Sequence, residues 1–146
     1  MKRFALLATA FLAGCSSSTE KKTEAPKARV SLVKIPVTDL ARASAFYREA
    51  LGLKEDFAAV EYGWAQYATG EVPLCLYVPG KGGGNGMPGR CDSVHLAVEN
   101  AAAYHDEMAK RCKSPVGAVM KSDDGGVFFE VKDPDGNVIK VMQGGK

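Results

Sequence analysis

The sequence predicts an α+β fold made of two consecutive βαβββ modules, and three observations support this prediction. First, residues 33–40 and 94–101 can be laid over each other, because each combines an alternating apolar strand with a helix-capping residue. Second, an amphipathic helical pattern follows each of these segments. Third, short strand-like runs separated by turn residues follow each helix.

Each module is expected to begin with a half-buried strand and a capped helix. The core-facing residues of these strands are Val33, Ile35 and Val37 in the first and Val94, Leu96 and Val98 in the second. Asp39 and Asn100 are suited to accept hydrogen bonds from the first free helix amides. The apolar stripe of the first helix consists of Leu40, Ala43, Phe46, Tyr47 and Leu51, and Gly52 ends it. A weaker stripe in the second helix consists of Ala101, Tyr104, Met108 and Cys112.

The remaining strands are expected at 57–60, 62–68 and 72–78 in the first module and at 116–121, 127–132 and 137–143 in the second. Gly70 and the Asp-Pro-Asp-Gly segment 133–136 supply turns between strands. The glycine-rich segment 79–89 is expected to be a flexible joint between the modules.

The first 28 residues are predicted to direct export and anchoring. Residues 1–14 join a basic start to an apolar run too short to span a bilayer, which is typical of a signal peptide. This run ends in Leu-Ala-Gly-Cys, which resembles the lipobox of bacterial lipoproteins, and the resemblance implies that the Cys15 thiol receives lipid. Residues 15–28 are then a lipidated, disordered tether, because 16–28 hold no large apolar side chain. An ordinary signal peptide with a chance cysteine is the alternative.

These features predict a lipid-anchored protein of the bacterial cell envelope that faces the periplasm. Ser16 follows the lipid cysteine, and this resembles the sorting rule for the outer membrane. Residues 29–146 are expected to form one domain with its own core. Of the 19 lysines and arginines, 17 remain once Lys2 and Arg3 leave with the signal peptide, and they face 17 aspartates and glutamates. Such a balanced surface argues against nucleic acid as a partner.

Two motifs resemble those of a known superfamily. The pattern V-x-D-L-x-x-x-x-x-F-Y-x-x-x-L-G runs from Val37 to Gly52, and D-P-D-G-N runs from Asp133 to Asn137. Both resemble the vicinal oxygen chelate superfamily, which includes glyoxalase I, extradiol dioxygenases, fosfomycin-resistance enzymes and bleomycin-resistance proteins. The resemblance implies two βαβββ modules whose mixed sheet curls around a cleft, with the helices on the outside.

The same resemblance implies a divalent metal ion in the cleft of the metal-dependent members, held by histidine and by glutamate or glutamine. Counting from the matched motifs places the ligand positions at Leu32, Cys75, Ser93 and Lys140. Leucine cannot bind a metal, a lysine ammonium repels a dication, and serine is a poor ligand. We therefore expect no metal and no cofactor. A zinc site made of Cys75, His95 and Glu130 is the alternative.

Strand alternation predicts which side chains line the cleft. They are Lys34, Trp64, Gln66, Cys75, Tyr77, Ser93, His95, Glu130 and Lys140. Aromatic surface combined with cations suits a small organic molecule that is anionic or aromatic. Two alternatives are that Trp64 is simply packed, and that Lys34 and Lys140 pair with Glu130 to fill the space.

Three functions follow from these residues. The first is a metal-free protein that binds a small organic molecule. The second is an enzyme, either glyoxalase- or lyase-like with an atypical site or using His95 and Glu130 as acid and base. The third is a structural envelope module without a ligand. The expected partners are a small molecule and, through the lipid alone, a membrane, and a homodimer is compatible with the sequence.

A disulfide between Cys91 and Cys112 is also predicted. Cys91 precedes the strand 94–98 and Cys112 ends the helix that follows it, so an antiparallel return of the helix would bring the two thiols together. Disulfides persist in an oxidising periplasm. Two separate buried thiols are the alternative, and Cys75 is expected to lie far from both.

Overall fold

The computed structural model describes residues 30–81, 83–91 and 94–144. The predicted signal peptide at 1–14, the lipid site at Cys15, the tether at 15–28 and the cleft residue Ser93 lie outside these described residues. Among the helices that the structure describes, none has the length and apolar character needed to cross a membrane.

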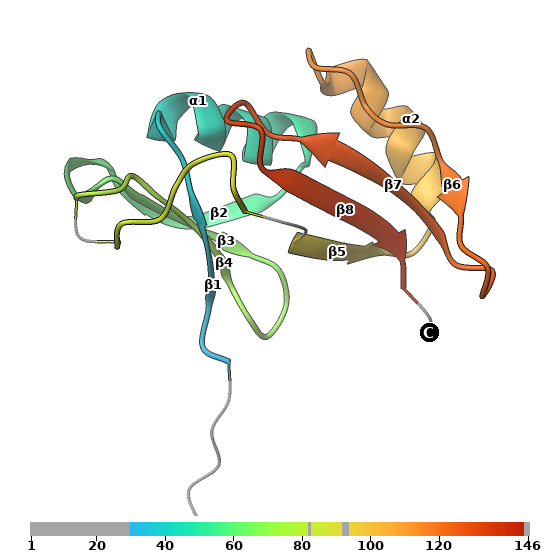
Figure 1. Ribbon diagram of the computed structural model, residues 1–146, viewed down its shortest axis with the longest axis horizontal. Coiled ribbons are helices and arrows are strands. Elements are labelled where there is room, and N and C mark those ends of the chain that lie inside the picture. The colour runs from blue at the N-terminus through green and yellow to red at the C-terminus, as the bar shows by residue number, and fades with distance from the viewer. Residues whose placement is uncertain (1–29, 82, 92–93, 145–146) are drawn as a thin grey trace, which may run out of the picture.

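The elements follow the expected βαβββ order twice (Figure 1). The first module contains β1 (Val33–Pro36), α1 (Leu40–Ala45), the π-helical turn η1 (Phe46–Ala50), β2 (Lys54–Ala59), the 3-10 turn η2 (Val60–Tyr62), β3 (Trp64–Ala68) and β4 (Leu74–Tyr77). The second contains β5 (Val94–Val98), α2 (Ala101–Arg111), β6 (Met120–Lys121), β7 (Val127–Lys132) and β8 (Val138–Gln143). The predicted strand at 116–121 is shorter than expected, because Val116 makes only an isolated bridge to Val131.

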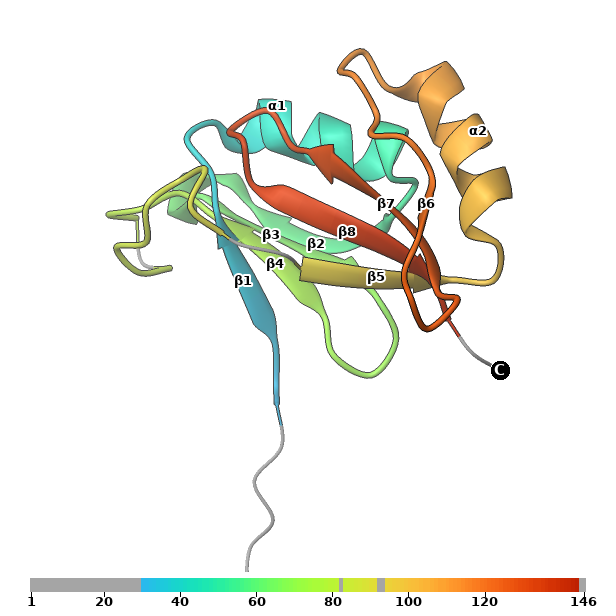
Figure 2. The same ribbon diagram turned by 45° about the vertical axis from the view of Figure 1, so that its right-hand side comes forward.

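Each module forms its own four-stranded mixed sheet, in the orders β1-β4-β3-β2 and β5-β8-β7-β6. In both sheets the first strand pairs parallel with the last, and the other pairs are antiparallel. The two helices lie along the upper side of the molecule in Figures 1 and 2, with the sheets below them. The predicted α+β class and its two modules are confirmed.

The helices are capped and buried as the sequence predicts. Asp39 accepts a hydrogen bond from the Arg42 amide, and Asn100 accepts one from the Ala103 amide, each over 2.9 Å. The chain leaves the first helix through Gly52 at a φ of 69°, a conformation that favours glycine. All five members of the first apolar stripe are buried, whereas in the second stripe Tyr104 and Cys112 are only half-buried.

The burial of the core-facing residues on the first strand of each module differs more from the prediction. Ile35 and Val37 are fully buried, but Val33 is 38% exposed. The core-facing residues of β5 are only half-buried along the whole strand, which is an edge of its sheet. One side of the contact between the modules is therefore less closely packed than the alternation pattern predicts.

The glycine-rich segment 79–89, whose composition predicts a flexible joint, is partly packed in the structure. Around Gly83 and Gly86 it lies against the first sheet, where the Gly86 amide donates to the Tyr77 hydroxyl over 3.0 Å. A Cβ atom on Gly83 would lie 2.4 Å from the Cβ of Tyr77, and one on Gly86 would lie 2.1 Å from its hydroxyl oxygen. Glycine is required at both positions because the backbone rests directly on the Tyr77 side chain.

The two modules are joined by a buried polar cluster around the turn 133–137. Tyr47 donates from its hydroxyl to the Asp133 carboxylate over 3.1 Å. Asn137 donates from its amide group to the Pro36 carbonyl over 3.0 Å and to Asp133 over 2.8 Å, and it accepts from the Cys91 amide over 3.1 Å. This cluster fixes the end of β1 against the start of β8.

Candidate functional site

The sheet registers place the predicted cleft residues in rows on two different sheets. On the first sheet, Cys75 pairs with both Lys34 and Gln66, and Tyr77 pairs with Trp64. On the second sheet, Lys140 pairs with both His95 and Glu130. The structure therefore brings together five predicted residues on one sheet face and three on the other, and Ser93 lies outside the described residues.

The glycine-rich segment covers the middle of the first sheet face. Cys75 is fully buried and Tyr77 is 6% exposed, although both were predicted to line an open cleft. The Lys34 ammonium donates to the Gly83 carbonyl over 2.6 Å and lies 5.2 Å from the centre of the Tyr77 ring. Lys34 thus holds the segment over the sheet, and only the outer part of this face stays open.

Cys75 is a buried thiol and not a candidate thiolate. Burial raises its pKa, and the charge of Lys34 lowers it by a smaller amount. Its sulfur lies 3.7 Å from the Gln66 side-chain oxygen, to which the thiol donates. Because the thiol keeps its proton at neutral pH, Cys75 is poorly suited to bind a metal ion or to act as a nucleophile.

On the second sheet, Lys140 packs over a neighbouring ring. Its ammonium lies 3.9 Å from the centre of the Phe128 ring, an arrangement that stabilises the charge. His95 and Glu130 are exposed on either side of it. Within the described residues neither Lys34 nor Lys140 forms an ion pair with Glu130, so the alternative in which they neutralise it is not supported.

The side chains at the implied ligand positions do not fit a divalent metal ion. Leu32 has no donor atom, Cys75 is protonated and buried, and the Lys140 ammonium would repel the ion. The alternative zinc site lacks a suitable sulfur donor, because burial covers the Cys75 thiol and raises its pKa. Among the described residues, no group of three or more histidine, cysteine, aspartate or glutamate side chains could hold a metal ion.

The open part of the first sheet face is an aromatic hollow of about 360 Å³. It is lined by Phe57, Ala59, Tyr62, Trp64, Lys81 and Gly83. Only Trp64 in this set was predicted from the sequence. Phe57 and Tyr62 are 54% and 65% exposed, so together with Trp64 they present apolar ring surface to solvent at this hollow. Strand alternation could have identified Phe57 from the sequence. Phe57 and Ala59 lie on the same face of β2, opposite Gln66 and Trp64 of the neighbouring strand.

Comparison with known proteins identifies the family. A model of the Glyoxalase/Bleomycin resistance protein/Dioxygenase superfamily matches residues 29–141. The chain belongs to this superfamily. The resemblance of the two sequence motifs to the vicinal oxygen chelate superfamily is thereby confirmed. No curated protein matches the chain by sequence.

Solved structures of the superfamily have the same fold. Lactoylglutathione lyase from Agrobacterium tumefaciens is 21% identical, with a TM-score of 0.65 over 82% of this chain and 96% of that one. An antibiotic-binding protein, TnmS3 from Streptomyces sp. CB03234, is 26% identical, with a TM-score of 0.63 over 82% and 98%. A glyoxalase-related enzyme from Fulvimarina pelagi is 17% identical, with a TM-score of 0.64 over 80% and 88%. Solved structures with this fold thus include both enzymes and an antibiotic-binding protein.

The two cysteines of the predicted disulfide lie at the edge of the core. Both half-buried side chains pack against the same apolar cluster. Cys112 has a free thiol, so the structure does not contain a disulfide between it and Cys91. The helix α2 packs on β7, η1 and β8 more than on the edge strand β5 that Cys91 precedes, which weakens the geometric argument for the pairing. The disulfide stays a prediction for protein folded under oxidising conditions.

Proposed function

We propose that this protein binds a small aromatic molecule without a metal ion, and that a lipid on Cys15 holds it at the bacterial envelope. The ligand packs on the aromatic hollow of the first sheet. The observation that carries this proposal is the chemistry at the implied ligand positions, where Leu32, the protonated Cys75 and Lys140 cannot hold the ion that metal-dependent superfamily members use.

The hollow supports an aromatic ligand with a negative group. Phe57, Tyr62 and Trp64 present ring surface, which favours stacking with a planar molecule. Lys81 at its rim adds a cation that favours an anionic substituent. The similarity to the antibiotic-binding protein from Streptomyces sp. CB03234 also favours a binding protein over a catalyst.

Trp64 is the only tryptophan of the chain, so its fluorescence reports occupancy of the hollow. Naphthalene-2-sulfonate is a suitable probe, and we expect it to quench Trp64 fluorescence to saturation, equally with and without a chelator. Phe57→Ala should weaken binding roughly tenfold, because a stacking ring is lost. Phe128→Ala removes a ring from the second sheet and is the matched control. Two results would contradict the proposal. One is saturable quenching that requires an added divalent metal, and the other is equal weakening of probe binding in the two variants.

The enzyme alternative makes the opposite prediction. A glyoxalase-like enzyme would form lactoylglutathione from methylglyoxal and glutathione when zinc, nickel or cobalt is supplied. We expect no metal-dependent rate above that of a Glu130→Gln variant, since Glu130 is exposed and pairs with a lysine across the sheet.

The envelope location is tested separately. Cys15→Ser should prevent incorporation of radiolabelled fatty acid and leave the protein unprocessed, because a hydroxyl cannot replace the thiol in lipid transfer. Cys112→Ser is the control and should be labelled like the parent protein. Equal labelling of the Cys15→Ser and parent proteins would refute the anchor while leaving the binding proposal intact.

A further inference from the structure

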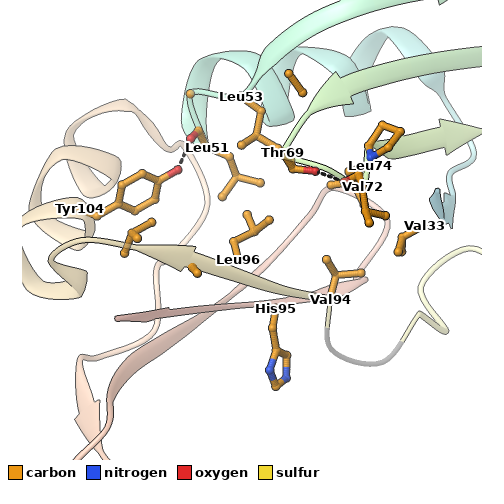
Figure 3. A pocket seen from close by; sticks show the side chains of 16 residues that line it. Val33, Leu51, Leu53, Thr69, Val72, Leu74, Val94, His95, Leu96 and Tyr104 are labelled. Atoms are coloured by element: carbon orange, nitrogen blue, oxygen red, sulfur yellow. Dashed lines mark hydrogen bonds between the residues drawn. The ribbon is translucent and has the colours of Figure 1, made fainter. Parts of the chain in front are cut away.

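A cavity in the described part of the chain lies between the two modules, away from the aromatic hollow. Its volume is about 610 Å³, within the range of small-molecule sites. Leu51, Leu53, Thr69, Val72 and Leu74 of the first module face Val94, Leu96, Val98 and Tyr104 of the second across this space. Figure 3 shows Val94 and Leu96 pointing into the cavity, whereas the His95 ring points away from it.

The internal repeat explains why the contact between the modules is open on the side of the cavity. Lys34 and Cys75 pair in the first module as His95 and Lys140 pair in the second. Cys75 and Lys140 therefore occupy equivalent positions in the two modules. Val72 and Asn137 each precede them by three residues, and Gly70 and Asp135 by five, so these residues are equivalent too.

Comparison of the helices of the two modules also pairs a polar residue with an apolar equivalent. Counted from the two capping residues, Met108 takes the place of Tyr47. On the closed side, Tyr47 and Asn137 bond across the modules. On the side of the cavity, apolar side chains stand at both equivalent positions, so the hydrogen bonds that close the first side cannot form on the second.

The walls of the cavity favour one ligand chemistry. No lysine, arginine, aspartate or glutamate occurs among the described residues that line it. Its two hydroxyl groups already have partners, since Thr69 donates to the Val72 carbonyl over 2.7 Å and Tyr104 donates to the Leu51 carbonyl. A charged ligand would be desolvated here without a counter-charge, which is costly, whereas an aliphatic one would replace water on apolar side chains.

We propose that this cavity is a second binding site, distinct from the aromatic hollow, and that it takes a neutral, largely aliphatic small molecule. The ligand lies between Leu96 of β5 and Val72 of the turn before β4. The half-buried state of the core-facing residues of β5 is then a property of the ligand-free protein, and ligand binding completes the apolar contact between the modules.

The test uses the full 146-residue chain made by cell-free synthesis without lipid. The probe is N-phenyl-1-naphthylamine, a neutral dye whose fluorescence rises in apolar sites. Leu96→Trp and Val72→Trp fill the cavity from opposite walls, and Ala102→Trp adds the same ring to the exposed side of α2. Circular dichroism and thermal melting establish that each variant is folded, and equilibrium dialysis measures naphthalene-2-sulfonate binding to the aromatic hollow in the same proteins.

We expect one probe per chain, displacement by 1-decanol but not by decanoate, and at least tenfold weaker probe binding in both cavity variants. Ala102→Trp should bind the probe like the parent, and all three variants should keep their affinity for naphthalene-2-sulfonate. Equal probe binding by all variants, or equal displacement by decanoate, would overturn the proposal. Light scattering gives one further result that would overturn it: a parent protein that is a dimer and cavity variants that are monomers. In that case a second copy of the chain, and not a small molecule, would cover the cavity. If the parent protein does not bind naphthalene-2-sulfonate at all, that result contradicts the proposed ligand site in the aromatic hollow and not the proposed site in the cavity.

Discussion

Tyr47 is a fully buried side chain whose hydroxyl group has a fixed partner in the other module. Its position in the apolar stripe of the first helix follows from the sequence, but its hydrogen bond to Asp133 does not. Burial, and next the charge of Asp133, raise the pKa of Tyr47 far above its ordinary value of 10.0. The folded protein therefore keeps this phenol protonated at any moderate pH.

The stability of the domain should fall above about pH 10, in part because of Tyr47. Below pH 10 both the folded and the unfolded state keep the phenol proton, so its contribution is complete. Above pH 10 the unfolded state releases the proton and the folded state does not, which lowers the free energy of unfolding by about 1.4 kcal/mol per pH unit. Tyr47→Phe should cost about 1 kcal/mol at pH 7 but make the alkaline fall less steep. Urea unfolding from pH 7 to 11 measures both effects. Tyr62→Phe, at an exposed ring, is the control, and an identical pH slope in all three proteins would contradict the prediction.

At the scale of elements, the glycine-rich segment between the modules decides which part of the first sheet face is accessible. Its composition predicts flexibility, because glycine and proline dominate it. In the structure its backbone rests on Tyr77, and this buries Cys75 below. Composition alone cannot distinguish a free linker from one whose glycines permit close contact with a ring.

Gly83→Ala should lift this segment from the sheet. The new Cβ atom would lie 2.4 Å from the Cβ of Tyr77, which the strand holds in place, so we expect a loss of about 1 to 3 kcal/mol in the free energy of unfolding. The Cys75 thiol should also become more reactive toward iodoacetamide, as site-resolved mass spectrometry can measure. Asn85→Ala alters an exposed residue of the same segment and should change neither quantity. Unchanged melting and alkylation in Gly83→Ala would show that the segment does not rest on the sheet.

At the scale of the whole molecule, the two modules are held together asymmetrically. On one side the buried Asn137 connects Pro36, Asp133 and Cys91, and on the other an apolar cavity separates the modules. A repeat with the same sequence pattern in both halves predicts two equivalent contacts. Among the described residues the structure contains one closed contact and one open one, because apolar residues replace Tyr47 and Asn137 on the open side. Tyr104, which donates to the Leu51 carbonyl, still connects the modules there.

Asn137→Ala should be among the most destabilising single changes in the domain. It removes three hydrogen bonds of a fully buried amide and leaves the Pro36 carbonyl without that donor, for an expected cost of about 3 kcal/mol or more. Asn100→Ala removes an exposed helix cap and should cost about 1 kcal/mol. Chemical denaturation of the two variants measures the difference. Equal costs would mean that the buried cluster does not hold the modules together.

The amino-acid sequence alone correctly predicts the βαβββ repeat, the two helix caps, the first apolar stripe and the superfamily. These features depend on local periodicity and on short motifs such as Val37–Gly52, which one stretch of chain contains completely. It also predicts that the implied ligand positions hold no metal ion, because a residue type that lacks a donor atom excludes a ligand wherever the chain places it. Three features become visible only in the folded chain: the predicted cleft residues divide between two sheet faces, Cys75 is covered, and Phe57 and Tyr62 line one hollow with Trp64. Those facts depend on how distant segments pack, and a periodic pattern specifies which face of a strand is apolar but not what comes to lie against it.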